Sequence, residues 1–176
     1  MRILGLDPGS RVTGYGLVEE AGGRFRHLAS GCLRPRGEDH LARLGELFRA
    51  VEALLAELRP EEVAVEQVFV RRNAASALKL GQARGALLGA VAARGLRVAE
   101  YSPAEIKQAL VGTGRARKEQ VQHMVRALLG LDREPPQDAA DALACALCHG
   151  QARRTLSRLP AGYRRRCLGG RWGRRR

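Results

Sequence analysis

The stretch that decides the fold is Ile3-Leu4-Gly5-Leu6-Asp7-Pro8-Gly9-Ser10-Arg11-Val12-Thr13-Gly14-Tyr15-Gly16. Residues 2–6 predict a short buried strand, and residues 12–19 alternate in the way that predicts a second strand. The Pro, Gly and Ser between them predict a turn. Asp7 therefore stands at the carboxyl-terminal end of a buried strand, the edge at which open α/β sheets bind their ligands.

Further along the chain the periodicity changes between strand and helix. A strand is predicted at 25–33, a helix at 41–58, a strand at 63–65, a helix at 74–94, a strand at 96–101, and helices at 103–110, 118–129 and 137–152. Strands that follow one another directly favour antiparallel pairing, whereas a strand reached through a helix can lie parallel to the first. We therefore expect an α/β fold with a mixed five-stranded sheet flanked by helices.

The charge is concentrated at one end of the chain. The 176 residues carry a net charge of +13, but residues 153–176 contain ten Arg and no acid, which leaves +3 (21 basic minus 18 acidic) for residues 1–152. We expect one domain at 1–152 and a disordered basic tail at 153–176. The basic balance favours a polyanionic partner, either a nucleic acid or an acidic membrane surface.

Targeting and disulfide signals are weak. The start of the chain does not read as a signal peptide, and no apolar run is long enough to span a bilayer, so we expect a cytoplasmic protein. Four cysteines are too few for a disulfide framework. Cys145 and Cys148 form a C-x-x-C pair beside His149, but one pair inside a helix lacks further ligands, so we expect buried apolar cysteines.

Four acidic residues stand out from this background. Asp7 and Glu66 each follow an apolar strand, and Asp138 and Asp141 share a face near the start of the last helix. Taken singly, such residues are more often turn formers or helix caps. Brought together, they would repel one another unless cations lay between them, and hard divalent ions such as Mg²⁺ or Mn²⁺ suit these oxygens. Two such ions about 3.5–4 Å apart would support phosphodiester hydrolysis.

Five motifs follow one another along the chain: residues 5–16, Glu66-Gln67-Val68-Phe69, the run 73–85 from Asn73 to Gly85, Gln120-Val121-Gln122-His123-Met124-Val125, and Asp138-Ala139-Ala140-Asp141-Ala142-Leu143. Together they resemble the RuvC family of Holliday junction resolvases. The resemblance covers roughly the first 150 residues. It implies an RNase H-like fold, a metal site formed by the four acids, and a homodimer that cuts opposed strands of four-way DNA junctions. It also implies a role in homologous recombination and DNA repair beside the branch-migration motor of RuvA and RuvB.

Five further residues are expected to contact DNA. The resemblance places Lys107 and Lys118 near the scissile phosphate. Phe69 could stack on an unpaired base while Arg71 and Arg72 hold phosphates, or Phe69 could belong to the core, and the resemblance favours the contact with DNA. The loop 112–118 opens a helix and suits phosphate contacts, but it lacks the ending of a Walker A loop.

Gly81, Gly85 and Gly89 recur every fourth residue on one helix and extend through small residues at either end. Such a face permits the close approach of another backbone, either from the chain's own sheet or from a second copy. Two copies would suit a junction of two-fold symmetry. We expect this helix to contribute to a dimer contact.

Two other functions remain open on the sequence. Residues 5–10 also resemble the phosphate loop of actin-like and sugar-kinase ATPases, but those enzymes need two lobes and this chain supplies one. A catalytically silent DNA-binding module is the second alternative, and the presence of all four acidic positions argues against it.

Overall fold

A computed structural model describes residues 1–67 and 74–158. The elements in chain order are β1 (Arg2–Asp7), β2 (Thr13–Ala21), β3 (Arg24–Leu33), α1 (His40–Leu58), β4 (Glu62–Glu66), α2 (Ala74–Ala93), β5 (Arg97–Tyr101), α3 (Pro103–Val111), α4 (Lys118–Leu129) and α5 (Gln137–Arg158). This order and the mixed five-stranded sheet confirm the fold class predicted from the sequence.

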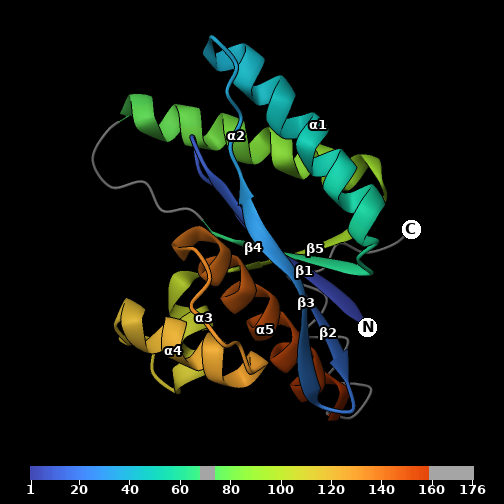
Figure 1. Ribbon diagram of the computed structural model, residues 1–176, viewed down its shortest axis with the longest axis vertical. Coiled ribbons are helices and arrows are strands. Elements are labelled where there is room, and N and C mark those ends of the chain that lie inside the picture. Colours follow the sequence, from blue (N-terminus) through green and yellow to red (C-terminus); the bar gives the residue numbers. More distant parts are fainter. Residues whose placement is uncertain (68–73, 159–176) are drawn as a thin grey trace.

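The sheet has the strand order β3-β2-β1-β4-β5. β1 pairs antiparallel with β2 and parallel with β4, and β4 pairs parallel with β5. The parallel pairing of β1 and β4 follows from the crossover through α1, as the sequence predicted. Figure 1 shows α1 and α2 on one face of the sheet and α3, α4 and α5 on the other.

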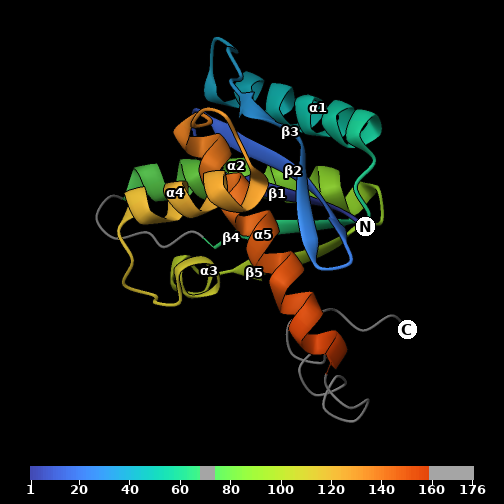
Figure 2. The same cartoon turned by 60° about the horizontal axis from the view of Figure 1, so that its bottom comes forward.

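Each face of the sheet has its own hydrophobic core. Leu4, Leu6, Val63 and Val65 project towards α1 and α2, while Ile3 and Ala64 project towards α5, in keeping with the alternation of side chains along a strand. Within α5, every residue from Ala142 to Gly150 is buried. The last helix is therefore a central element of the fold, and Figure 2 shows it passing across the sheet.

Glycines allow α5 to lie unusually close to β1 and β2. A Cβ atom on Gly5 would overlap the carbonyl oxygen of Ala142, and one on Gly14 would overlap the carbonyl oxygen of Asp138. A Cβ on Gly16 would lie 2.6 Å from the side chain of Leu143. Glycine within a strand often marks such an approach of a second backbone. We call Gly5, Gly14 and Gly16 the glycine seat of α5.

α5 ends later than the sequence predicted. The sequence predicted that the helix would stop at 152, because the Arg-rich segment after it has no apolar periodicity. The helix instead continues to Arg158, and Arg154 donates a hydrogen bond to the carbonyl oxygen of Gly23, 2.9 Å away. Residues 153–158 therefore continue α5, and residues 159–176 lie outside the described part of the chain. In residues 1–67 and 74–158, no helix has the length and hydropathy of a membrane span.

Candidate active site

Asp7 and Glu66 are the last residues of two neighbouring parallel strands. Leu6 of β1 pairs with Val65 of β4, so the two acids that follow leave the sheet side by side. This is the arrangement expected from the sequence for a ligand site at the carboxyl-terminal edge of a parallel pair. Both side chains are half-buried. In Figure 1 this edge lies on the left, where α5 begins.

The first turns of α5 bring Asp138 and Asp141 to the same edge. Gly14 pairs with Asp7 across β1 and β2, and the backbone of Asp138 rests directly on Gly14. The glycine seat therefore sets how near Asp138 comes to Asp7. Asp141 lies one turn further along the helix and shares a pocket with Glu66.

Burial and the charges of neighbouring acids make Asp7 and Glu66 hard to ionise. Burial, with the charges of Asp141 and Asp138, raises the pKa of Asp7 to about 6. Burial, with the charges of Asp7 and Asp141, raises the pKa of Glu66 to about 7. Like charges gathered out of water are stabilised when cations are supplied to them. The four acids that the sequence selected therefore interact electrostatically, although they lie up to 134 positions apart.

A small pocket of about 150 Å³ opens beside Glu66 and Asp141. Lys107 and Lys118 line it from α3 and α4, and the remaining wall is mainly apolar: Pro103, Ile106, Val121 and Ala144. Nζ of Lys118 lies 2.6 Å from Oδ2 of Asp141. Both lysines therefore line the same pocket as Glu66 and Asp141, and Lys118 forms an ion pair with Asp141.

The four acids offer the hard oxygen ligands that Mg²⁺ and Mn²⁺ prefer, and the raised pKa values of Asp7 and Glu66 indicate a deficit of positive charge at these two carboxylates. Lys118 supplies part of that charge through its pair with Asp141. Within residues 1–67 and 74–158, no three His, Cys, Asp or Glu side chains already form a closed coordination group. The residues fit a divalent cation by type and charge.

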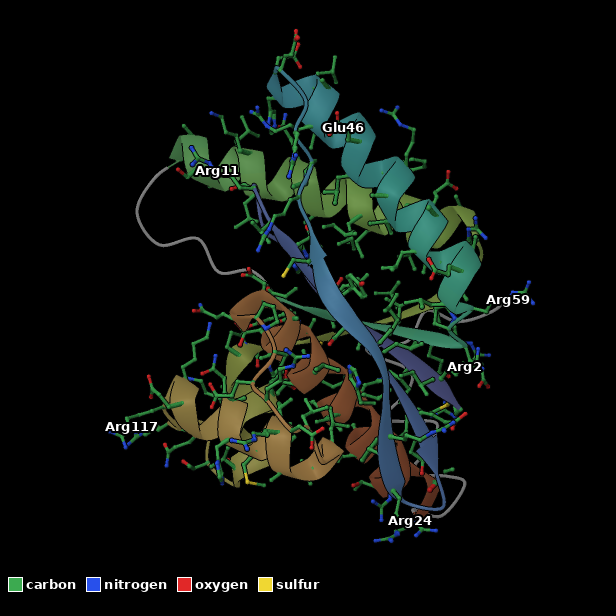
Figure 3. The ribbon with its side chains drawn as sticks, viewed as in Figure 1. Arg2, Arg11, Arg24, Glu46, Arg59 and Arg117 are labelled. Atoms are coloured by element: carbon green, nitrogen blue, oxygen red, sulfur yellow. The ribbon has the colours of Figure 1, made fainter. Side chains whose placement is uncertain are left out.

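The expected DNA contacts lie partly outside the described residues. Phe69, Arg71 and Arg72 fall within residues 68–73, so their contacts stay predictions. The loop 112–117, which precedes α4, lies within the described residues. Its Ala116 is buried against the core, while Arg115 and Arg117 are exposed. Figure 3 shows Arg11 and Arg117 on the side of the molecule away from Arg2 and Arg59. Exposed arginines thus lie on the side where β1 and β4 end.

The C-x-x-C pair does not form a metal site among the described residues. Cys145 and Cys148 are buried free thiols, as the sequence predicted, and burial raises the pKa of both. His149 beside them points elsewhere, towards Tyr101 and Glu62.

Sequence reasoning missed two features that support the site. The first is the glycine seat, whose available signal was the Gly-x-Gly spacing of residues 14 and 16 inside a predicted strand. The second is the buried contact between His149 and Glu62, two residues separated by 87 positions, 2.7 Å apart at Nε2 and Oε2. The presence of His149 among the apolar residues of the last helix indicates that its side chain needs a polar partner, but the sequence does not identify Glu62 as that partner.

Comparison with known proteins gives a consistent result. Residues 3–149 match the family model described as crossover junction endodeoxyribonuclease RuvC. A protein of that description from Alkalilimnicola ehrlichii is 63% identical over 148 residues, which cover 84% of this chain and 90% of the relative. A second, from Halorhodospira halophila, is 58% identical over 166 residues, covering 93% of this chain and 99% of the relative.

Solved structures agree. The Thermus thermophilus RuvC structure aligns with a TM-score of 0.80 at 41% identity, covering 88% of this chain and 96% of that one. RuvC from the same organism in complex with a Holliday junction substrate aligns with a TM-score of 0.83 at 40% identity over the same shares. The yeast mitochondrial Holliday junction resolvase shares the fold, with a TM-score of 0.65 at 12% identity and coverage of 95% of this chain and 85% of that one.

Proposed function

This chain belongs to the RuvC family of crossover junction endodeoxyribonucleases, and we propose that it resolves four-way (Holliday) DNA junctions by hydrolysing opposed strands. The fold is RNase H-like, and the enzyme is a divalent-metal-dependent hydrolase. Its products would be nicked duplexes, the outcome needed to complete homologous recombination and DNA repair.

We assign Asp7, Glu66, Asp138 and Asp141 as the ligands of two Mg²⁺ ions, which Mn²⁺ can replace. The observation that supports this most directly is the pairing of β1 with β4, which places Asp7 and Glu66 side by side facing α5. When bound, divalent cations polarise the phosphodiester and activate water, so no side-chain nucleophile is needed. The two strand-end acids hold fixed positions, whereas Asp138 and Asp141 depend on how α5 sits on the sheet.

The lysines of the pocket have a complementary part in this mechanism. Lys107 and Lys118 lie beside Glu66 and Asp141, where a scissile phosphate would add further negative charge. Asp141 would hold a metal ion, and Nζ of Lys118, which pairs with Asp141 in the structure, would then be able to donate to a phosphate oxygen. Arg115 and Arg117 on the exposed loop would hold the flanking backbone, together with Phe69, Arg71 and Arg72 from outside the described residues.

The active unit is proposed to be a homodimer, because cutting two opposed strands needs two sites related by two-fold symmetry. A Cβ on Gly81 or Gly85 of α2 would meet open space, whereas Gly89 faces Phe48 of α1. Leu78 on the same helix is 64% exposed. The stretch 78–85 of α2 therefore has room for a second copy. Partnership with the RuvA and RuvB motor belongs to the same proposal.

The test is a cleavage assay on synthetic four-way junctions and matched linear duplexes, with and without Mg²⁺ or Mn²⁺. Wild type should place paired nicks in the junction alone, and a chelator should abolish them. Asp7→Asn should lose cleavage but retain junction binding. Asp132→Asn is a matched control, since Asp132 is an exposed acid outside the site. ATP hydrolysis without cutting would favour an ATPase, and metal-independent binding without cutting would favour a silent binding module.

A further inference from the structure

A buried chain of polar groups links β5, α5 and β4 behind the candidate active site. Oη of Tyr101 lies 2.8 Å from Nδ1 of His149, whose Nε2 lies 2.7 Å from Oε2 of Glu62. Arg153 donates to the other oxygen of Glu62. The side chain of His149 is 0% exposed. The rings of Tyr101 and His149 also meet edge to face, with centroids 5.8 Å apart.

The direction of these hydrogen bonds follows from the charge of Glu62. Burial opposes its ionisation, but hydrogen bonds from His149 and Arg153 outweigh burial and lower the pKa of Glu62 to about 2. Glu62 is therefore an anion that accepts from Nε2–H of His149. In neutral His149, Nδ1 then accepts from the hydroxyl of Tyr101. Buried polar groups satisfied in this way hold one arrangement, because any shift leaves a polar group unpaired.

The position of this polar chain connects it to the metal carboxylates. Glu62 and Glu66 are the first and last residues of β4, and their even spacing puts both on the face that carries α5. His149 and Asp141 are eight residues apart on α5, about 12 Å along the helix. β4 and α5 are thus joined at one end by Glu62 and His149, and at the other end Glu66 and Asp141 share the pocket. Figure 2 shows α5 crossing these strands.

The glycine seat and the polar chain constrain α5 in different ways. The backbone of α5 lies directly on Gly5 and Gly14, and the side chain of Leu143 packs on Gly16. These apolar contacts set how near the helix lies to the sheet. The hydrogen bonds of His149 to Glu62 and Tyr101 add a directional constraint on the position of α5 along β4.

We propose that His149, held by Glu62 and Tyr101, is a positioning residue that fixes the register of α5 and so keeps Asp141 and Asp138 opposite Glu66 and Asp7. This inference rests on the proposed metal-dependent function. It goes beyond that function in assigning a role to a buried network that touches neither DNA nor metal.

The decisive comparison is between Glu62→Leu and Glu62→Gln in the full-length protein. Leucine breaks the polar chain. Glutamine can preserve it, because its amide nitrogen can donate to Nε2 while the other tautomer of His149 donates from Nδ1 to Tyr101. Glu61→Leu is the matched control, since neighbouring Glu61 contacts the backbone of Arg2 instead of α5. Val51→Ala loosens the opposite core and controls for reduced stability alone.

Mn²⁺ affinity by calorimetric titration, and kcat and KM on a junction, should be measured at a temperature where all variants are folded. Thermal unfolding of each variant identifies that temperature. Glu62→Leu should weaken Mn²⁺ binding about tenfold and lower kcat by at least about tenfold, since small misplacements of ligands are costly. KM for the junction should change by less than about twofold, because the DNA contacts lie elsewhere. Glu62→Gln, Glu61→Leu and Val51→Ala should bind Mn²⁺ like wild type.

If Glu62→Leu binds Mn²⁺ and turns over like wild type, or if Val51→Ala reproduces its defect, His149 has a stabilising role only and the inference is overturned. If Glu62→Leu does not fold, Tyr101→Phe replaces it, because that change removes one hydrogen bond and keeps the ring. Tyr101→Phe should then weaken Mn²⁺ binding by about two- to fivefold, and no change would overturn the inference. Wild type that neither binds Mn²⁺ nor cuts junctions would overturn the proposed function itself.

Discussion

Nζ of Lys118 lies 2.6 Å from Oδ2 of Asp141, so the chain supplies its own cation to one of the four acids of the site. The two side chains are 41% and 22% exposed, and such a pair adds little to the stability of the fold. This ammonium group would compete with a metal ion for the carboxylate of Asp141.

Replacing Lys118 by methionine should therefore separate binding from catalysis. Lys118→Met should bind Mn²⁺ more tightly, on the order of tenfold, because a positive charge beside the site is removed. Its kcat on junctions should fall, because the phosphate loses a nearby cation. Calorimetric titration and single-turnover cleavage measure the two effects, with Lys79→Met on α2 as control. Unchanged affinity would show that the ammonium group and the metal do not compete.

Metal binding should depend on pH. The pKa of Asp7 is raised to about 6 and that of Glu66 to about 7, first by burial and then by neighbouring acids, and a metal must displace these protons. Mn²⁺ affinity should therefore be at least about tenfold lower at about pH 5.5 than at about pH 7.5. Titrations in buffers of different ionisation enthalpy should detect proton release. Equal affinity at both pH values would contradict the assignment of these ligands.

The same groups set the pH dependence of stability in the metal-free protein. Because their folded-state pKa values are raised, their contribution to stability is fully present below about pH 4 and is lost as pH rises through 6 and 7. Glu62 acts in the opposite sense, but its contribution is lost only as pH falls towards 2. Denaturant unfolding in chelator should therefore show less pH-dependent loss between about pH 5 and 8 in Asp7→Asn than in wild type.

The glycine seat should not tolerate even one methyl group. Gly14→Ala would overlap the carbonyl oxygen of Asp138, so we expect a loss of about 1–3 kcal/mol in the free energy of unfolding and a marked loss of Mn²⁺ affinity. Gly45→Ala is the matched control. It meets only the end of the Arg49 side chain at 3.5 Å, within a helix, and should stabilise the protein by about 0.5–1 kcal/mol. A fully stable Gly14→Ala would mean that α5 can move away from β2 without cost.

Phe69 belongs to a segment whose DNA contacts are still a prediction. Phe69→Ala should lower junction cleavage about tenfold, because an aromatic ring for base stacking is removed, and leave Mn²⁺ affinity and thermal unfolding unchanged. A loss of folding would instead identify Phe69 as a core residue.

The basic tail should add non-specific affinity for DNA. Residues 159–176 contain seven arginines. Deleting residues 159–176 leaves α5 complete, whereas a deletion that begins at 153 would also remove Arg153, which pairs with Glu62. The deletion should reduce the slope of log K against log salt by up to about 0.9 for each phosphate that the tail neutralises. A slope equal to that of the full chain would count against a DNA-binding tail.

The sequence predicted the fold because its signals are local or follow from chain connectivity. The alternation in 12–19 and the helical spacing in 41–58 are visible within short windows, and the crossover through α1 implies that β1 and β4 run parallel. From this, Asp7 and Glu66 could be placed at one edge of the sheet.

The sequence could not predict contacts between side chains that lie far apart along the chain. Nothing local pairs Lys118 with Asp141, which lie 23 positions apart, or His149 with Glu62. The last turns of α5 were missed because their stability comes from tertiary contacts such as that of Arg154 with Gly23.

The dependence of the site on α5 has a consequence during synthesis of the protein. Asp7 and Glu66 leave the ribosome early, but Asp138 and Asp141 arrive on the last described helix, which must then dock against β1 and β2, strands made more than a hundred residues before. On the proposed assignment, a nascent chain that has not reached α5 carries two of the four metal ligands and should not cut DNA. Cleavage activity would then be acquired only after α5 has been synthesised and has docked on the sheet.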